Sequence, residues 1–368
     1  MNPYIDDLTQ KAIDLACDLQ QVPSPTFHEE RKAERIRQRF QALGLEEVRK
    51  DAAGNVLARI PGDDSARPMI FSAHMDTVFP ENFPLTLNCT PERLSGPSVG
   101  DNSLGLASLL LIPDLIRSTG KRPAGDIWLA ATTCEEGLGD LHGIRAVAVR
   151  FGAAPIAYIS IEGMGLGNIL HRGLGVERYR VTINTSGGHS WVDYGQPSAV
   201  HEISTLAARL ADLRLPKKPR TTLNIGVIQG GTSINTIASS AWMEIDLRSE
   251  NADQLSGLSS RVRAAVDAAK RAEVEVFCER IGYRPPGELE RGHPLIETAS
   301  AILRELGLAV QLDIASTEAN LPLSLGYPAI TIGITTGDHA HSAREYINTA
   351  GISKGLQQIL HLIQRAWN

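Results

Sequence analysis

Seven acidic and imidazole side chains in this sequence could act together in one chemical site, because most of them follow a short apolar run. They are His74, Asp76, Asp101, Glu135, Glu136, Glu162 and His341. Carboxylates that converge on one point repel one another, and burying several of them is unfavourable without positive charge. Divalent cations resolve that conflict. Imidazole and carboxylate ligands without thiolate suit zinc, cobalt or manganese in a catalytic role.

Each of these residues also has an ordinary structural interpretation when it is taken alone. Asp101 comes just before an apolar helical run, where an aspartate commonly caps the helix. The pair Glu135 and Glu136 could be solvated on the surface. A lone histidine is more often hydrogen-bonded or exposed than a ligand, and His339 competes with His341 for such a role. The hypothesis of a metal site therefore depends on the coincidence of several such residues at predicted strand ends.

The elements that must position these residues follow an alternating pattern of helices and strands. The expected helices of the first part are residues 4–21, residues 27–43 and an apolar run from Leu104 that stops at Pro113. The expected strands are residues 55–60, 69–73, 126–133 and 157–161. Apolar strands that alternate with helices indicate a largely parallel sheet covered by helices. Ligands bind outside the carboxyl ends of such strands, where these residues fall.

The pattern changes at about residue 175. Strand, helix, strand, strand, helix and strand are expected over residues 177–184, 198–213, 221–229, 236–248, 252–271 and 273–279, the split-βαβ order. After residue 282 the alternation returns, with expected elements over 294–306, 310–315, 329–334 and 352–367. We therefore predict a first domain of residues 1–174 and 283–368, interrupted by an inserted domain of residues 175–282. The predicted fold class is α/β, a mostly parallel sheet sandwiched by helices, with an inserted α+β domain.

Five segments together resemble the successive metal-site motifs of the M20 metallopeptidases. The segments are Ser72–Val78, Gly100–Asn102, Cys134–Gly137, Ile161–Gly163 and His341–Tyr346. The resemblance keeps the order of the motifs and covers essentially the whole chain. It implies a zinc-exopeptidase-like catalytic domain with two divalent metal ions, most often zinc, and an inserted ferredoxin-like lid. That architecture agrees with the pattern of elements above.

The resemblance also implies how the ions are held. His74 and Glu162 would bind one ion, Glu136 and His341 would bind the other, and Asp101 would bridge the two.

Two further residues receive roles from the same resemblance. Asp76 would accept a hydrogen bond from the His74 ring and so fix its tautomer. Glu135 would be the general base, which takes a proton from the bridging water and hands it to the leaving amine. The family spacing of histidine, three residues and glutamate favours His341 over His339 as the ligand.

Three residues of the inserted domain lie in segments that resemble lid motifs of the family. His189, in the run Gly-Gly-His-Ser, would enter a dimer partner's active site and stabilise the developing oxyanion, which implies a homodimer through the lid. A turn histidine is the alternative. Asn235 and Arg248 would contact the substrate, Arg248 by a bidentate bond to a carboxylate, and a surface salt bridge is the alternative for Arg248.

Two departures leave the substrate open. Glu318 stands where the family usually has aspartate, so neither Glu318 nor the nearby Asn320 is given a role. Glutamate at position 162 favours carboxypeptidases and deacylases, whereas the segment Glu135–Asp140 resembles the peptidase T branch. The predicted activity is hydrolysis of a small peptide or an N-acyl amino acid. The alternatives are an inactive metal-containing binding or regulatory protein of the same fold, and an amidase that acts on a non-peptide amide.

Composition argues against several other classes. The formal net charge of −6 gives no reason to expect nucleic acid as a partner. The longest apolar run, Leu104–Ile112, is shorter than the ~20 residues of a membrane span. The N-terminus lacks a basic region followed by an apolar core, so we expect no signal peptide and a cytoplasmic protein. The cysteines form no C-x-x-C pair and are expected to be reduced, with Cys134 a packing residue rather than a nucleophile.

Overall fold

The computed structural model describes residues 3–367 and divides the chain into two compact units. One unit contains the chain up to Gly173 and from Gly287 onward, and the other is Leu174–Pro286. Each unit encloses its own hydrophobic core. The inserted unit ends four residues later than the expected residue 282, because its last strand continues to Arg284.

The first unit is built on a mixed sheet flanked by helices, so the predicted α/β fold class is confirmed. Its helices are α1 (Pro3–Gln20), α2 (Glu30–Ala42), α3 (Gly105–Arg117), α4 (His142–Phe151), α7 (Pro294–Glu305), α8 (Asn320–Ser324) and α9 (Ile352–Arg365). The strands of the sheet are β1 (Glu46–Lys50), β2 (Val56–Ile60), β3 (Met69–His74), β6 (Ile127–Thr132), β7 (Ala157–Met164), β8 (Asn168–Gly173), β15 (Gly287–Glu288), β16 (Gln311–Ala315) and β17 (Ala329–Thr335). They follow the order β1-β2-β6-β3-β7-β17-β8-β15, and β16 also pairs with β8.

Only the centre of this sheet and one outer pair are parallel. β3 runs parallel to both β6 and β7, β17 runs parallel to β7, and β16 runs parallel to β8. The pairs β1–β2, β2–β6, β8–β17 and β8–β15 are antiparallel. The expected mostly parallel sheet is therefore mixed. A parallel pair needs a long crossover, and the short link over residues 51–55 between β1 and β2 allows only a hairpin.

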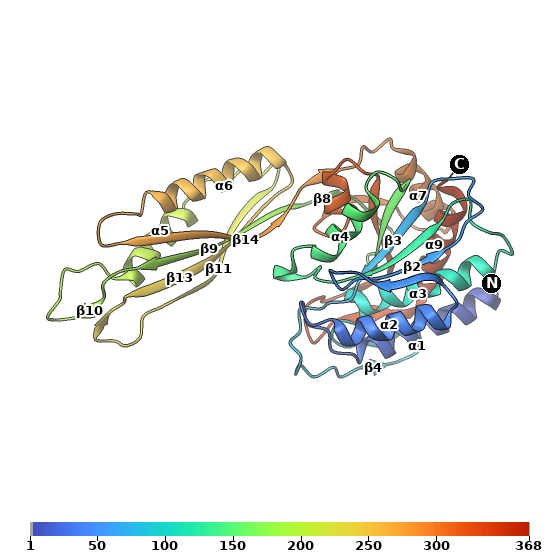
Figure 1. The fold of residues 1–368 in the computed structure, drawn as a ribbon, viewed down its shortest axis with the longest axis horizontal. Helices are drawn as coiled ribbons and strands as arrows, with labels where there is room; N and C mark the ends of the chain where they lie inside the picture. Colours follow the sequence, from blue (N-terminus) through green and yellow to red (C-terminus); the bar gives the residue numbers. More distant parts are fainter. Residues whose placement is uncertain (1–2, 368) are drawn as a thin grey trace. The chain divides into compact units, whose positions relative to one another are not determined.

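Helix α3 is the central buried helix of the first unit. It packs against β3, β6 and β7, and both α1 and α2 pack on it (Figure 1). The helix extends beyond the apolar run that stops at Pro113, because α3 continues to Arg117 with the proline inside it. A proline removes one hydrogen bond from a helix, and here the burial of nearly every other side chain stabilises the helix in spite of that loss. The stretch Val99–Arg117 is long and apolar enough to cross a membrane, but 89% of it is buried, as in a core helix.

A second, small sheet of the first unit lies beside the main one. It consists of β4 (Asn88–Cys89), β5 (Arg93–Ser95), β18 (Gly337–Asp338) and β19 (Tyr346–Asn348) in the order β18-β19-β5-β4. These strands were not predicted from the sequence, because each is only two or three residues long. The loop between β18 and β19 carries His341.

The inserted unit has the strand order of a split βαβ fold. Its antiparallel sheet contains β9 (Gly175–Asn184), β11 (Thr221–Gly230), β13 (Ser240–Ser249) and β14 (Glu275–Arg284) in the order β11-β13-β9-β14. Helices α5 (Ala199–Ala211) and α6 (Ala252–Asp267) pack on the sheet and on each other (Figure 1). The single strand expected over 236–248 is instead two, because β12 (Thr236–Ile237) pairs with β10 (Gly188–His189) while β13 pairs with β11 and β9 in the antiparallel sheet of the inserted unit.

Candidate metal centre

Three neighbouring strands bring the first candidate residues to one edge of the main sheet. β3 ends at His74, which lies opposite Thr132, the last residue of β6. Because β6, β3 and β7 are parallel, their carboxyl ends meet at the same edge. Glu135 and Glu136 follow β6 directly. We expected Glu162 to follow the strand over residues 157–161. It instead lies inside β7, because that strand continues to Met164.

Asp101 lies in an irregular helical segment, Val99–Leu104, that packs closely on β7. The Asn102 side chain fixes this segment, since its amide donates to the Ile161 carbonyl at 2.8 Å and its Oδ1 accepts from the Gly163 N–H at 3.0 Å. A Cβ atom at Gly163 would lie 2.2 Å from the Gly100 carbonyl oxygen, so the close approach requires glycine. The backbone contact therefore explains why Asp101 meets the strand edge from a distant part of the chain.

Both carboxylate oxygens of Asp101 face an imidazole. His74 Nε2 lies 3.1 Å from Asp101 Oδ1, and His341 Nε2 lies 3.0 Å from Asp101 Oδ2. The helix that follows has no side-chain cap bond. Asp101 thus occupies the position between two histidines, and the alternative of a capping residue does not describe it.

Two groups of possible ligands share Asp101. In the first group, the ligand atoms of His74, Asp101 and Glu162 lie within 4.8 Å of one another. In the second group, the ligand atoms of Asp101, Glu136 and His341 also lie within 4.8 Å of one another. His341 Nε2 is 2.9 Å from Glu136 Oε1. The structure therefore brings together the five residues that the sequence suggested as ligands.

His339, the alternative to His341, has a different environment. Its side chain is exposed and its ring makes an edge contact with Tyr346, with centroids 6.0 Å apart. Among the described residues, neither group of possible ligands includes His339.

Asp76 is buried and contacts both His74 and the segment that carries Glu135 and Glu136. Its backbone carbonyl is 3.0 Å from His74 Nδ1, whereas its carboxylate is 3.5 Å from that atom. The carboxylate instead accepts the backbone N–H groups of Glu135 at 2.9 Å and Glu136 at 2.8 Å. The acceptor nearest to the His74 ring is thus the backbone carbonyl of Asp76, whereas the sequence indicated the Asp76 side chain. A donating Nδ1–H leaves Nε2 with its lone pair toward Asp101.

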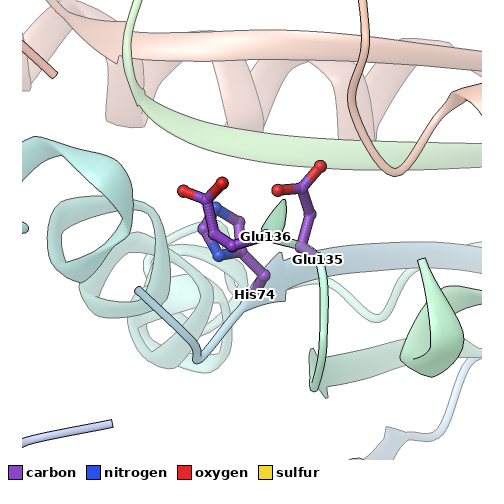
Figure 2. A group of neighbouring side chains, drawn as sticks. All are labelled: His74, Glu135 and Glu136. Carbon is purple, nitrogen blue, oxygen red and sulfur yellow. The ribbon is translucent and has the colours of Figure 1, made fainter. Parts of the chain in front are cut away.

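Glu135 extends to the same side of the chain as Glu136, and the His74 ring lies beside Glu136 (Figure 2). Possible ligand atoms of these three residues lie within 4.8 Å of one another, and both glutamates are buried. The turn that presents them begins at Cys134, whose φ is 54°. Glu29 holds this turn, because its Oε1 accepts the Cys134 N–H at 2.9 Å. Burial raises the pKa of the Cys134 thiol to about 12, so this cysteine is not an activated nucleophile.

Glu345 is a functional candidate that sequence reasoning left without a role. Its buried carboxylate accepts the backbone N–H groups of Ser98 at 3.1 Å, Gly100 at 2.7 Å and Asp101 at 2.9 Å. It therefore fixes the segment that carries Asp101. The available signal was its position four residues after His341.

The electrostatics show that the acidic edge attracts positive charge. Hydrogen bonds to Asp101 and Glu136 raise the pKa of His341 to about 10. Burial lowers the pKa of His74, but Glu162, Asp101 and Asp76 outweigh burial and raise that pKa well above its usual value. Burial raises the pKa of Glu162 to about 7. The carboxylates that raise the pKa of both imidazoles favour positive charge at this edge, and divalent cations fit the same donor set.

The candidates of the inserted unit form two local arrangements. His189, the last residue of β10, and Asn235, in the turn before β12, are neighbours, because β10 pairs with β12 and the Ser190 N–H donates to the Asn235 carbonyl at 3.1 Å. Both side chains are exposed. Arg248, on β13, donates through Nε to Asp246 Oδ1 at 2.7 Å, which is the salt bridge considered as its alternative role.

A mixed sheet flanked by helices, with two histidine–carboxylate groups at one edge, is the arrangement of a family of peptidases and amidohydrolases. The chain belongs to peptidase family M20/M25/M40, whose family model matches residues 70–365. The resemblance inferred from the five motifs is thereby confirmed.

Individual proteins are similar to this chain over nearly its full length. The protein YqjE of Bacillus subtilis (strain 168) is 22% identical over an alignment of 366 positions, which covers 95% of this chain and 96% of that protein. The solved structure of the aminopeptidase PepT from Bacillus cereus is similar with a TM-score of 0.79 at 21% identity, covering 98% of this chain and 99% of that one. YXEP of Bacillus subtilis, described as a dinuclear metal binding peptidase, is similar with a TM-score of 0.71 at 16% identity, covering 97% and 98%. These structural likenesses concern the fold.

Proposed function

We propose that this protein hydrolyses the amide bond of a short peptide or an N-acyl amino acid with the help of two divalent ions. The observation that carries the proposal is the position of Asp101, whose two oxygens lie 3.1 and 3.0 Å from the Nε2 atoms of two different histidines. A carboxylate in that position can bridge two cations. Glu162 completes the group around His74, and Glu136 completes the group around His341.

The donor set favours zinc, with cobalt or manganese as alternatives, because each group offers one imidazole and two carboxylates and no thiolate. When bound, such ions lower the pKa of an attacking water and polarise the carbonyl of the scissile amide. The dinuclear description of the similar protein YXEP supports a pair of ions in place of one.

Glu135 is the group that we assign to proton transfer. Its backbone is fixed by the Asp76 carboxylate, and its side chain is buried beside His74 and Glu136. A carboxylate oxygen of Glu135 would accept a proton from the attacking water and deliver it to the leaving nitrogen. The same carboxylate is thus a base in the first step and an acid in the second.

Two observations bear on the substrate class. The likeness to the aminopeptidase PepT favours a short peptide, whereas glutamate at position 162 favours deacylation or attack at the carboxyl end. We propose that His189, Asn235 and Arg248 contact the substrate. Arg248 would then exchange its bond to Asp246 for one to a substrate carboxylate. We also propose a cytoplasmic location, which the four free cysteines support.

The decisive test replaces the proposed base without touching the proposed ligands. Glu135→Gln should reduce turnover of a dipeptide, tripeptide and N-acyl amino-acid library by at least about 10²-fold, because general acid–base catalysis contributes ~10²–10⁴-fold. Elemental analysis should still find two ions per chain in this variant. The exposed residue Glu30 supplies the matched control, and Glu30→Gln should behave as wild type.

Chelation provides the second arm of the same test. Removal of the ions should abolish hydrolysis, and zinc, cobalt or manganese should restore it. Full activity of Glu135→Gln would refute the role of that residue. Tight binding of library compounds by the wild type without any hydrolysis would instead favour a metal-containing binding protein of the same fold.

A further inference from the structure

Glu318 is a buried carboxylate that the chemistry above does not use. Its side chain is 1% exposed and lies just before α8. Three hydroxyl groups donate to it. Ser72 Oγ is 2.7 Å and Ser160 Oγ 3.4 Å from Glu318 Oε2, and Thr132 Oγ1 donates to Oε1. A carboxylate that is buried with only neutral partners is costly, so this arrangement calls for a physical reason.

The three hydroxyls come from the three strands that form the edge of the metal centre. Ser72 lies on β3, Thr132 on β6 and Ser160 on β7. Ser72 lies opposite Ser160, and Thr132 lies opposite His74. Glu318 therefore ties the ends of three adjacent strands together.

Two of these hydroxyl residues stand directly below residues of the first ligand group. Residues two apart on a strand point to the same face, so Ser72 and His74 share one face of β3, as Ser160 and Glu162 do on β7. Glu318 consequently lies one layer beneath His74 and Glu162. The residues of the second group that are not shared, Glu136 and His341, lie in loops beyond the strand ends.

The charge of Glu318 acts on the same group. Burial raises the pKa of Glu318, and the hydroxyl of Thr132 and the imidazole of His74 lower it. A negative charge at Glu318 and a positive charge between His74 and Glu162 stabilise each other, because such coupling is reciprocal.

We propose that Glu318 is a positioning residue that strengthens binding of the cation held by His74 and Glu162, and has little effect on the cation held by Glu136 and His341. This inference rests on the proposed function, since it requires a metal pair at the site. The length of the glutamate side chain matters, because this one side chain contacts hydroxyls on three strands.

The test separates the two ion sites by removing one histidine at a time. His341→Ala leaves only the group around His74, and His74→Ala leaves only the group around His341. Zinc affinity of each apoprotein is measured by competition with a chromophoric chelator, with and without Glu318→Gln. Loss of an outer partner of a metal ligand typically lowers affinity ~10–100-fold. We expect that loss in the His341→Ala background and none in the His74→Ala background.

A second pair of variants keeps the test decisive if Glu318→Gln does not fold. Thr132→Val removes one hydroxyl with little change of shape, and Thr132→Ser retains it as the matched control. Thr132→Val should weaken zinc at the His74 group, and Thr132→Ser should not. Circular dichroism and thermal unfolding establish that each variant is folded.

The outcomes separate this inference from the proposed function. A wild-type protein that binds no pair of ions would refute both. Two ions in the wild type, with unchanged zinc affinity in folded Glu318→Gln and Thr132→Val proteins, would overturn the role of Glu318 alone. An equal loss in both histidine backgrounds would also overturn it, because the effect would then be general to the fold.

Discussion

Replacing Asp76 by asparagine tests which part of the site this residue positions. The Asp76 carboxylate accepts the N–H groups of Glu135 and Glu136, and its second oxygen also accepts the Thr26 hydroxyl at 2.9 Å. Burial raises the pKa of Asp76, but its interaction with His74 and the two backbone N–H groups outweigh burial and lower it, so the native group is ionised. Asparagine retains one acceptor oxygen and presents an NH₂ group where the other was.

The size of the effect follows from those bonds. One backbone N–H, of Glu135 or Glu136, loses its acceptor, and a buried unsatisfied donor costs ~1–3 kcal/mol. Loss of the charge weakens the remaining bond by ~1 kcal/mol, since bonds to charged groups are about twice as strong as neutral ones. The sum of ~2–4 kcal/mol corresponds to a fall in kcat/KM of about 30- to 1000-fold.

The assay is steady-state hydrolysis combined with zinc titration of the two sites. Because the backbone carbonyl that contacts His74 is unchanged in Asp76→Asn, zinc at the His74 group should be largely retained, and zinc at the Glu136 group should weaken. Thr26→Val is the matched control, with an expected loss of ~1 kcal/mol or less. If the loss of zinc were confined to the His74 group, the carboxylate would act on the imidazole as the sequence first indicated, and the reasoning from the backbone contacts would be refuted.

Three other perturbations have definite expected outcomes. Burial lowers the pKa of Lys32 from 10.5 to about 8, so its contribution to stability is present above pH 10.5 and is lost as the pH falls through 8. In denaturant unfolding, Lys32→Met should therefore be more stable than the wild type by ~3 kcal/mol at neutral pH. A difference in unfolding free energy that does not narrow by about pH 10 would contradict this. Cys134→Ser should retain kcat/KM close to wild type, and a loss beyond about tenfold would reveal a chemical role for the thiol. Mixed dimers of His189→Ala and Glu135→Ala chains should regain one working site if His189 acts across an interface, and failure to do so despite measured subunit exchange would refute action in trans.

The last of these experiments has a structural motive in the inserted unit. Large apolar side chains lie exposed in the turns that carry His189 and Asn235. They are Trp191, Val192, Tyr194 and Ile234, with 86%, 75%, 90% and 103% of their surface exposed. Apolar patches of this kind mark interaction surfaces on many proteins, and a partner chain would cover them.

Much of the main sheet could be predicted because its signals are local. Helix α1 buries Ile5, Leu8, Ala12, Ala16 and Leu19, a helical spacing that is visible in the sequence. The strands β3, β6 and β17 are buried along their whole length and read as apolar runs. Strand β1 was missed because it is a polar, largely exposed edge strand without alternation. Residue types that match the buried or exposed state of an element make that element predictable.

The site was only partly accessible to the same reasoning. The order of the motifs indicated His74, Asp101 and Glu162, and the sheet topology brings them together. Other contacts depend on side-chain directions in the folded protein. They are the acceptor of the His74 ring, the backbone partners of Glu345 and the hydroxyls around Glu318. Those directions are set by contacts between segments as far apart as 247 residues, as for Ser98 and Glu345, and no local pattern encodes them.

The position of β17 has a consequence for how this protein emerges from the ribosome. β17 inserts between β7 and β8, although both of those strands are made more than 150 residues earlier. A nascent chain that ends before residue 329 therefore has a gap in the middle of its main sheet, and one that ends before His341 lacks an imidazole of the proposed metal pair. On the proposed function, hydrolytic competence is acquired only after residue 341 has been made, and truncated products are expected to be both inactive and prone to aggregate through the open strand edges.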